Sequence, residues 1–495
     1  MTSSVAVRSY DTHWIGGQWA RSDAEGAIDV ENPATETVLA SIPAGTAGDV
    51  RRAVAAASAA FPQWSTQPVR VRVAFLERLV AGLQARADEF ADVISSEVGA
   101  PFQMARRVQV GLGLAIASSY LDIAPTFAYE KRVGNSSVVK EAAGVAACIT
   151  PWNVPLLLTL QKIVPAIVAG CTVVLKPSEL APLNARLLAE VIAECDLPPG
   201  VFNVVFGAGP VVGSALASDP DVDVVSFTGS VPAGRAVARA AADTVKLVHL
   251  ELGGKNASVV LDGADLELAV RATVDQMCIN SGQACLQWSR LLVPRHQQEE
   301  ALAMAADVAA RYRVGDPTDP ETDLGPLVSA GAAKRVRGYI EQGIEDGARL
   351  VAGGPERPEG LPVGHYVRPT VFGDVRDTMA IAQEEIFGPV LSVLPYDSEE
   401  EAVRIANGTP YGLHGAVWAG DTEHGVRVAR RIRTGLVDVN GGPFNVLAPF
   451  GGVKQSGIGR ECGPEGLDAF LATKAMQLPA DAAELAGPRL QEIKS

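Results

Sequence analysis

Two residues that can act together on a carbonyl carbon stand at the two ends of one segment, in the runs LELGGKN (250–256) and NSGQACLQWSR (280–290). Cys285 supplies a thiol, which can attack the carbon, and Glu251 supplies a carboxylate, which can later activate water to release the product. Glycines beside each residue let the backbone come close to a ligand. We predict that these two residues carry out the reaction.

Cys285 has to be distinguished from the other five cysteines of the chain, because most buried cysteines only fill space. It alone is flanked by a glycine and a glutamine in a polar loop between apolar segments, where nucleophiles are commonly displayed. A small core residue is the alternative. None of the six histidines stands in a motif that suggests a base for the thiol, and His249, within an apolar β run, is expected in the core.

Three other stretches have residues suited to binding a dinucleotide, and a fourth has an asparagine suited to binding an oxyanion. GAGPVVG (207–213) follows an apolar strand and is close to a dinucleotide fingerprint, with one extra residue between its last two glycines. VVSFTGS (224–230) leads into a helix whose first N–H groups could hold a pyrophosphate. KPSE (176–179) could bind ribose hydroxyls, and the Asn of TPWN (150–153) could donate to an oxyanion. Tight turns, a helix cap and a solvated loop are the alternatives for these stretches.

These residues need a scaffold, and the pattern from residue 144 onward provides it. Strands that are apolar along their whole length alternate with helices, which predicts parallel sheets covered on both faces. The chain before residue 124 is largely helical, with runs at 50–61, 69–98 and 102–121. A short polar hairpin with a Gly134-Asn135 turn follows, and we expect it to be an arm that contacts another subunit.

Composition excludes several classes of protein. The 495 residues are 47% hydrophobic and 20% charged, which is typical of a folded globular protein with two or three domains. A net charge of -15 argues against nucleic-acid or anionic-membrane partners. The scattered cysteines have no metal-ligand spacing and indicate a reducing, cytoplasmic compartment. No signal peptide is recognisable, and the most apolar window, 163–175, is too short for a membrane span.

Taken together, the motifs resemble those of the aldehyde dehydrogenase superfamily in order and approximate separation. The resemblance runs from IGGQW near residue 15 to LATK near residue 472, and it is carried by TPWN, KPSE, FTGS, LELGGKN, GQAC, EEIFGPV and the PFGG…SGIGRE run. It implies an α/β fold with two doubly wound parallel-sheet domains and a small β oligomerisation arm. The expected domains are an NAD-binding domain (1–124 and 144–253), a catalytic domain (254–450), and the arm with the C-terminal tail (125–143 and 451–495).

The resemblance also assigns roles. Cys285 would be the nucleophile, Glu251 the general base, Asn153 with the Cys285 N–H the oxyanion hole, and Glu461 a proton relay to the base. Contacts with NAD, or with NADP in its place, would come from Thr150, Pro151, Trp152, Lys176, Ser178, Glu179, Gly209, Gly213, Phe227, Gly229, Ser230, Leu252, Glu385 and Phe387. Substrate contacts would come from Val154, Leu158, Gln161, Ile279, Leu286, Phe444 and Phe450. No metal is required.

Three positions depart from the usual family pattern. Leu286-Gln287-Trp288 follows the nucleophile where the family has small residues, Val154 replaces a common aromatic residue, and Ala472 replaces an acid in a subunit-contacting segment. The substrate set is mainly apolar, so we expect an apolar aliphatic or aromatic aldehyde, although Gln161 leaves room for a polar one.

We therefore predict a cytoplasmic NAD-dependent aldehyde dehydrogenase that forms free carboxylic acids and assembles as a homodimer or homotetramer. Two other functions are considered. Acyl transfer to coenzyme A is disfavoured because the hydrolytic route, not the transfer, needs Glu251. A non-catalytic structural or binding protein is disfavoured because such a protein has no physical need for Cys285, Glu251 and Asn153 together.

Overall fold

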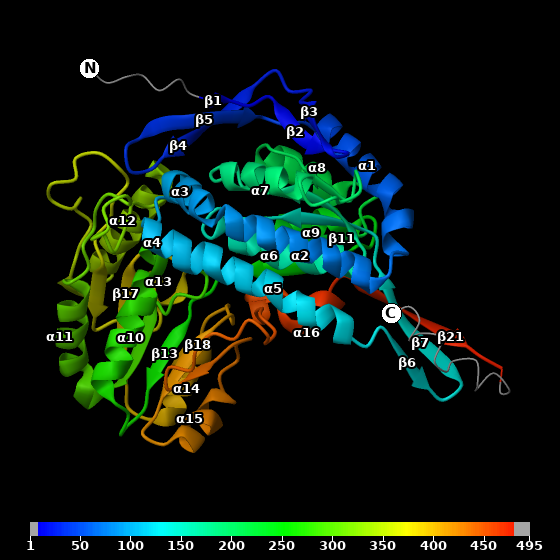
Figure 1. Ribbon diagram of the computed structural model, residues 1–495. Coiled ribbons are helices and arrows are strands. Elements are labelled where there is room, and N and C mark those ends of the chain that lie inside the picture. The colour runs from blue at the N-terminus through cyan, green and yellow to red at the C-terminus, as the bar shows by residue number, and fades with distance from the viewer. Residues whose placement is uncertain (1–7, 480–495) are drawn as a thin grey trace, which may run out of the picture.

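Two large sheets form the body of the protein in the computed structural model, which describes residues 8–479 (Figure 1). The first sheet has eight strands in the order β20-β12-β11-β8-β9-β10-β2-β3, and the second has seven in the order β15-β16-β17-β14-β13-β18-β19. The chain passes from the first sheet to the second between β12 (Leu247–Leu252) and β13 (Ala257–Val260), across the glycines that follow Glu251.

The central strands of the first sheet are parallel and buried on both faces, as their apolar sequences predict. Along β8 (Val145–Ile149), Ala146 and Cys148 face the core under α6, while Ala147 and Ile149 face the core under α1. The other elements of this unit are β9 (Thr172–Lys176), β10 (Phe202–Val204), β11 (Val224–Gly229), α1 (Ala47–Ser65), α6 (Pro155–Ala169), α7 (Leu183–Ala193), η2 (Gly209–Gly213), α8 (Ser214–Ser218) and α9 (Val231–Ala242).

Antiparallel strands close the edges of this sheet, so the prediction of parallel pairing holds only for its centre. At one edge β2 (Thr12–Ile15) and β3 (Gln18–Arg21) form a hairpin next to β10. At the other edge β20 (Gly457–Ile458), from the glycine-rich tail, pairs with β12 and carries the tail back over the body. Glu461 is thereby brought close to the strand that carries Glu251.

The second sheet is parallel except at β15, which pairs antiparallel with β16. Its elements are β13, β14 (Arg290–Pro294), β15 (Arg349–Ala352), β16 (Thr370–Gly373), β17 (Val390–Tyr396), β18 (Gly415–Trp418), β19 (Asp438–Val439), α10 (Leu266–Cys278), η3 (Ile279–Gly282), η4 (Arg295–Gln297), α11 (Gln298–Ala309), α12 (Ala330–Glu345), α13 (Ala380–Gln383), α14 (Glu399–Asn407) and α15 (Thr422–Ala429).

Helices from the N-terminal part cover one face of the first sheet. The predicted run 69–98 is two helices, because the backbone leaves helical geometry at Arg86, between α2 (Val69–Ala85) and α3 (Ala87–Val98). The continuous helical segment Phe102–Thr126 is apolar and long enough to cross a membrane, but half of its most apolar window is buried inside the protein and it packs on α2 and α6 as a core helix does. It comprises α4 (Phe102–Met104), η1 (Ala105–Val110) and α5 (Gly111–Thr126).

A three-stranded sheet projects from the body as an arm (Figure 1). Strands β6 (Glu130–Val133) and β7 (Ser136–Ala142) form the predicted hairpin around Gly134-Asn135, and β21 (Leu471–Gln477) pairs with β7, placing Ala472 opposite Glu141. The remaining elements are β1 (Arg8–Ser9), β4 (Ala27–Asn32), β5 (Thr37–Pro43), η5 (Lys454–Ser456) and α16 (Gly463–Asp468).

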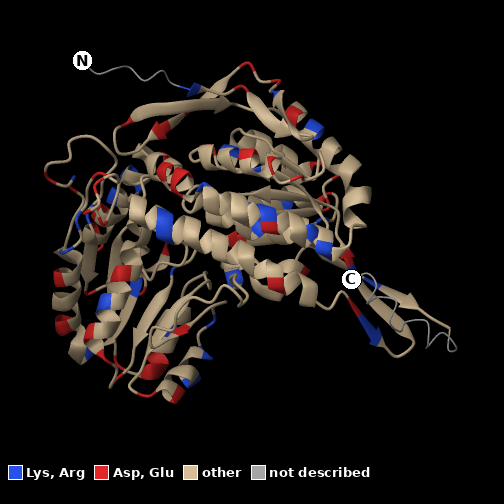
Figure 2. Cartoon of the chain, viewed as in Figure 1, with Lys and Arg blue, Asp and Glu red and all other residues tan. Residues whose placement is uncertain are grey.

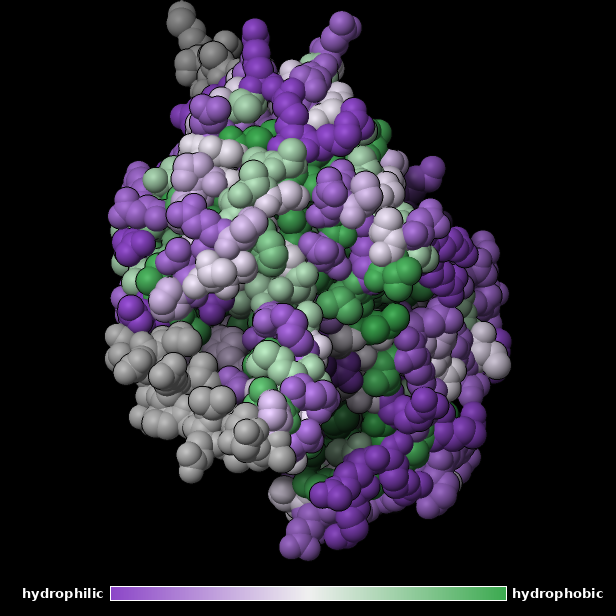
Figure 3. Space-filling view, turned by 90° about the vertical axis from the view of Figure 1, so that its right-hand side faces the viewer, coloured by the Kyte–Doolittle hydropathy of each residue, from purple (hydrophilic) through white to green (hydrophobic). Residues whose placement is uncertain are grey.

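Charge and hydropathy are distributed differently over the surface. In the view of Figure 2, basic and acidic residues are interspersed along the chain. On the face from which the arm projects, hydrophobic side chains gather in a hollow between the two lobes (Figure 3). The arm and tail segments contribute exposed apolar residues, among them Val133, Ile458 and Met476.

Candidate active site

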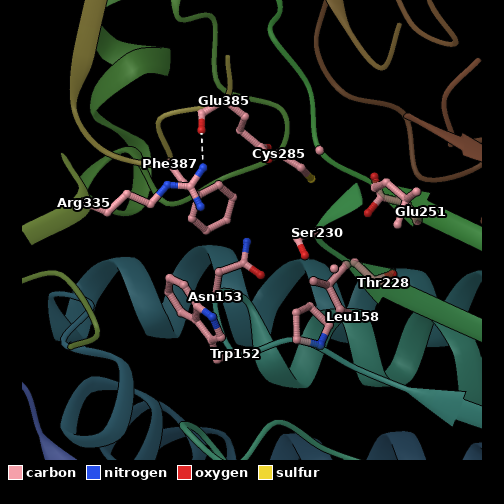
Figure 4. Close-up of a pocket in the computed structure, with 14 residues that line it drawn as sticks. Trp152, Asn153, Leu158, Thr228, Ser230, Glu251, Cys285, Arg335, Glu385 and Phe387 are labelled. Carbon is pink, nitrogen blue, oxygen red and sulfur yellow. Dashed lines mark hydrogen bonds between the residues drawn. The ribbon is translucent and has the colours of Figure 1, made fainter. Parts of the chain in front are cut away.

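A cavity of about 170 Å³ lies where the carboxyl ends of β11 and β12 face loops of the second sheet (Figure 4). Eleven of its 14 lining residues are among those that the sequence predicts, and Thr228, Gly253 and Arg335 are the other three. The predicted members are Pro151, Trp152, Asn153, Leu158, Gly229, Ser230, Glu251, Leu252, Cys285, Glu385 and Phe387. The cavity therefore unites residues from both sheets.

Cys285 lines this cavity and is partly exposed, whereas the other five cysteines are buried. Its sulfur is directed toward the side of the cavity where Glu251 lies (Figure 4). The preceding turn holds Asn280, Ser281 and Gly282 at positive φ, a conformation that side chains rarely adopt. A Cβ on Gly282 would lie 2.1 Å from the carbonyl carbon of Gly388, so this turn presses against the loop that carries Glu385. Backbone strain of this kind is typical of functional sites.

Side-chain amides hold the nucleophile loop in place. Asn256 Nδ2 donates to the carbonyls of Cys285 (2.7 Å) and Gln287 (2.8 Å), and Gln287 Nε2 donates to Gly388 O (2.8 Å). Asn280 Nδ2 donates to Asn153 O (2.8 Å). Asn256 belongs to the LELGGKN stretch, but the sequence gives no sign that its amide reaches across to residue 285.

Asn153 stands before α6 with its side-chain amide near the cavity. Its Nδ2 donates one hydrogen to Gln283 O at 3.0 Å, which fixes the amide and leaves its second hydrogen for another acceptor. Within residues 8–479, the Cys285 backbone N–H has no protein acceptor. Both predicted oxyanion donors therefore have a hydrogen available for another acceptor.

Glu251 is almost fully buried at the end of β12, and neither carboxylate oxygen has a hydrogen-bond partner within the described residues. Burial raises the pKa of Glu251 well above its ordinary value, and the nearby Glu461 carboxylate raises it further. Burial also raises the pKa of the Cys285 thiol, with Glu251 as the next largest cause. Both shifts act in the direction of the protonated groups.

A buried cation lies behind the carboxylate. Lys162, on α6, forms an ion pair with Glu461 and donates to Ser226 Oγ at 3.2 Å. Its positive charge lowers the pKa of Glu251, opposing the effect of burial. Sequence reasoning missed Lys162, although the one charged residue in a mainly apolar helix is a usable signal, because a buried charge needs a partner.

On the cofactor side, the predicted residues lie around the first sheet. Lys176 Nζ donates to Glu179 Oε2 (2.8 Å), and Gly209 N donates to Glu179 Oε1 (3.2 Å), so Glu179 connects the KPSE and GAGPVVG stretches. Gly213 lies near the Lys176 side chain. Ser230 is the exposed N-cap of α9, where its hydroxyl accepts from Ala233 N.

The nicotinamide side of the predicted site comes from the second sheet. Trp152 and Phe387 meet edge to face with their ring centroids 5.5 Å apart, and Phe387 has a positive φ. Glu385 Oε1 accepts from Gly254 N at 3.1 Å, and burial raises the pKa of Glu385 to about 7. Arg335 donates to Glu385 O (Figure 4), but nothing in the sequence distinguishes it from the other basic residues of its helix.

Several predicted residues lie outside the cavity itself. Among the substrate set only Leu158 lines it, while Gln161 is buried in α6 and Phe444 and Phe450 pack on each other with centroids 6.2 Å apart. Glu461 lies beyond Glu251, and Phe450 exchanges two backbone hydrogen bonds of 2.7 Å with it. The cavity is also not lined by six other predicted residues: Thr150, Ser178, Phe227, Val154, Ile279 and Leu286.

Comparison with known proteins assigns the family. A model described as the aldehyde dehydrogenase family matches residues 19–476. The chain belongs to the aldehyde dehydrogenase family. A 3-succinoylsemialdehyde-pyridine dehydrogenase from Pseudomonas sp. is 46% identical over 471 residues, covering 95% of this chain and 99% of that protein.

Solved structures of other aldehyde dehydrogenases share the fold. A cysteine-to-alanine mutant of aldehyde dehydrogenase C from Pseudomonas syringae, in complex with NAD+ and octanal, has a TM-score of 0.94 at 46% identity and covers 94% of this chain and 96% of its own. An aldehyde dehydrogenase of Mycobacterium tuberculosis complexed with NAD+ has a TM-score of 0.93 at 43% identity and covers 96% of this chain and 99% of its own.

Proposed function

We propose that this aldehyde dehydrogenase oxidises apolar aliphatic or aromatic aldehydes to carboxylic acids with NAD+, through a covalent intermediate on Cys285 that is hydrolysed with Glu251 as general base. The observation that carries this proposal is the position of both side chains in the wall of one cavity, with the sulfur directed toward the carboxylate (Figure 4). Asn153 contributes to the same wall.

The residues around the cavity fit a dinucleotide. Thr228 is buried, its hydroxyl has no partner within the described residues, and it lines the cavity, so a polar group of a ligand can satisfy it. The start of α9 at Ser230 suits a pyrophosphate, Lys176 and Glu179 suit ribose hydroxyls, and the Glu179 carboxylate would repel a 2′-phosphate. When bound, NAD+ accepts a hydride.

The first half of the reaction uses the nucleophile loop. The Cys285 thiol loses its proton to solvent, and the sulfur then adds as the thiolate to the aldehyde carbon. The resulting alkoxide would be held by the free Asn153 amide hydrogen and the Cys285 N–H, neither of which has to reorganise during the step. Loss of hydride from the same carbon leaves a thioester on the sulfur.

The second half needs water and a base. Glu251 in its ionised form takes a proton from water, the oxygen adds to the thioester carbon, and the carbon–sulfur bond breaks to release the acid. With no partner on either oxygen within residues 8–479, the carboxylate is not held by another contact of the protein. The Lys162 and Glu461 pair behind it offers a route for the proton to leave.

Apolar substrates are favoured by Leu158, which lines the cavity. Leu286, Phe444 and Phe450, the other apolar residues that the family resemblance assigns to the substrate, lie outside this cavity, and the two phenylalanines form an aromatic pair. Octanal, bound to the Pseudomonas syringae relative, and the pyridine-containing substrate in the name of the Pseudomonas sp. relative are an aliphatic and an aromatic example of this class. The exposed apolar residues of the arm support assembly as a homodimer or homotetramer, which sedimentation of the purified protein would measure.

The test is a panel of aliphatic and aromatic aldehydes assayed by NADH absorbance, with the wild type beside Cys285→Ala. The wild type should reduce NAD+ with apolar aldehydes, at a rate that added coenzyme A leaves unchanged. The variant should be inactive, because no other partly exposed thiol is present in the described chain. Equal rates in the two proteins would refute the proposal.

A further inference from the structure

The residues directly behind the nucleophile meet a buried histidine. His414, which precedes β18, faces three groups: its Nδ1 lies 3.2 Å from Trp288 Nε1 and 3.1 Å from Leu286 O, and its Nε2 lies 3.1 Å from Asp438 Oδ2. His414 and Trp288 are 2% and 3% exposed, so water cannot replace these contacts. Leu286 and Trp288 belong to the segment after the nucleophile in which this chain departs from the usual family pattern.

The two partners of Nδ1 make opposite demands on it. An indole N–H can only donate, so Trp288 requires a lone pair on Nδ1. A carbonyl can only accept, so Leu286 requires a proton on the same atom. The neutral ring meets the first demand, with Nδ1 accepting from Trp288 and the Nε2 hydrogen donated to Asp438. The doubly protonated ring meets the second and turns Nδ1–H against the Trp288 N–H.

His414 is also joined to the nucleophile through its backbone. Its N–H donates to Asn256 Oδ1 at 3.1 Å, and Asn256 Nδ2 donates to the carbonyls of Cys285 and Gln287. The carbonyl on each side of Leu286 is thus held by Asn256, while the carbonyl of Leu286 itself faces the His414 ring. A change at Nδ1 therefore acts on the peptide between Leu286 and Gln287, one residue after Cys285.

We propose that His414 is a positioning residue for the nucleophile loop. Its neutral ring accepts a hydrogen bond from the Trp288 N–H and keeps the loop in the reactive conformation. When the ring gains a second proton, Nδ1–H donates to Leu286 O instead. This inference rests on the proposed role of Cys285. Within residues 8–479, Asp438 is the charged side chain in contact with the ring, whereas Trp288, Leu286 and Asn256 are uncharged. Asp438 stabilises the protonated ring, and Trp288 stabilises the neutral one.

The opposed partners give variants that shift the pH dependence in opposite directions. Trp288→Phe removes the donor that favours the neutral ring, so the acid limb of the kcat profile should move to higher pH, by about 0.5 or more on the pH scale. Asp438→Asn removes the charge that favours the protonated ring, so the limb should move to lower pH. His414→Asn keeps an acceptor near Trp288 but cannot gain a second ring proton, so its acid limb should reflect Glu251 alone, while activity at the wild-type optimum stays within about fivefold.

Trp418 provides a matched control. It is equally buried, packs on Trp288 with ring centroids 6.2 Å apart, and donates its indole N–H to Ser258 rather than to the loop. Trp418→Phe removes an indole hydrogen bond from the same core and should leave the acid limb in place. A merely structural role for His414 predicts lower thermal stability in all of these variants and no shift of the limb.

The experiment is the pH profile of kcat for NADH formation by the wild type and the four variants, with Cys285→Ala assayed in parallel. Opposite shifts in Trp288→Phe and Asp438→Asn, with none in Trp418→Phe, support the proposal. The proposal is overturned if the two variants shift the limb in the same direction or not at all, or if Trp418→Phe shifts it equally. If Trp288→Phe does not fold, the profiles of Asp438→Asn and His414→Asn decide whether the proposal holds. An active Cys285→Ala protein would instead refute the proposed function, whatever the profiles show.

Discussion

The two groups proposed to react, Cys285 and Glu251, are held in opposite ways. Around Cys285, four amide side chains, Asn153, Asn256, Asn280 and Gln287, each bond to a carbonyl of the surrounding loops, so the backbone beside the sulfur is fixed from several sides. Around Glu251 there is no such network: both oxygens are buried and without partners in the described chain.

The difference follows the chemistry proposed for each residue. A nucleophile must meet one carbon in one orientation, so a fixed loop lowers the cost of reaching the transition state. A base must gain and lose a proton, and a carboxylate with hydrogen-bond donors on it would be a weaker base. Burial without partners among the described residues keeps the pKa of Glu251 high, and the Lys162 charge limits the rise.

The largest expected effect comes from a change among the amide side chains around Cys285. Asn153→Ala removes a proposed oxyanion donor, and kcat should fall by about 10² to 10³-fold. Alkylation of Cys285 by iodoacetamide forms no oxyanion, so its rate should stay close to that of the wild type. Steady-state kinetics measure kcat, and the time course of alkylation measures the reactivity of the thiol. An equal loss in both would mean that Asn153 only supports the loop.

The next largest effect tests how the charge of Lys162 acts on Glu251. Lys162→Met removes the cation that lowers the pKa of Glu251, so that pKa should rise and less of the base should be ionised at a given pH. The hydrolysis-limited kcat should therefore fall on the acid side of its pH profile and recover as the pH is raised. Lys176→Met removes the cation of another buried pair, with Glu179, and should change the KM for NAD+ but not this profile.

A smaller effect concerns the stability of the turn before Cys285. Gly282→Ala places a Cβ at a φ of +74° and against Gly388, and the free energy of unfolding should fall by about 1 to 3 kcal/mol. Gly263 has a φ of +80° and open space around it, so Gly263→Ala isolates the conformational part of the cost. Thermal unfolding compares the stability of the two variants. Equal losses of stability would show that the contact with Gly388 is unimportant.

The sequence predicts the centre of the fold and the wall of the cavity for the same reason. Apolar strands such as 145–149 can only be buried on both faces, and glycines and polar residues at strand ends must then meet at one edge of a sheet. The edge strand β20 is two residues long and has no such pattern, so its antiparallel pairing with β12 is not predictable.

What the sequence does not reveal is which distant side chains meet. Trp288 and His414 are 126 positions apart, and Asn256 and His414 are 158 apart, with no local motif that points from one to the other. Neither composition nor periodicity specifies a contact between single polar groups, because that contact depends on how distant elements pack together. The resemblance to a family did not help either, since Trp288 departs from the family pattern.

The most direct test of the central claim separates the two halves of the reaction in time. Stopped-flow absorbance of Glu251→Gln mixed with NAD+ and an apolar aldehyde should show about one NADH per active site formed rapidly through Cys285, followed by steady turnover about 10² to 10⁴-fold slower than that of the wild type, because the thioester then waits for a base. Steady turnover equal to that of the wild type would contradict the account.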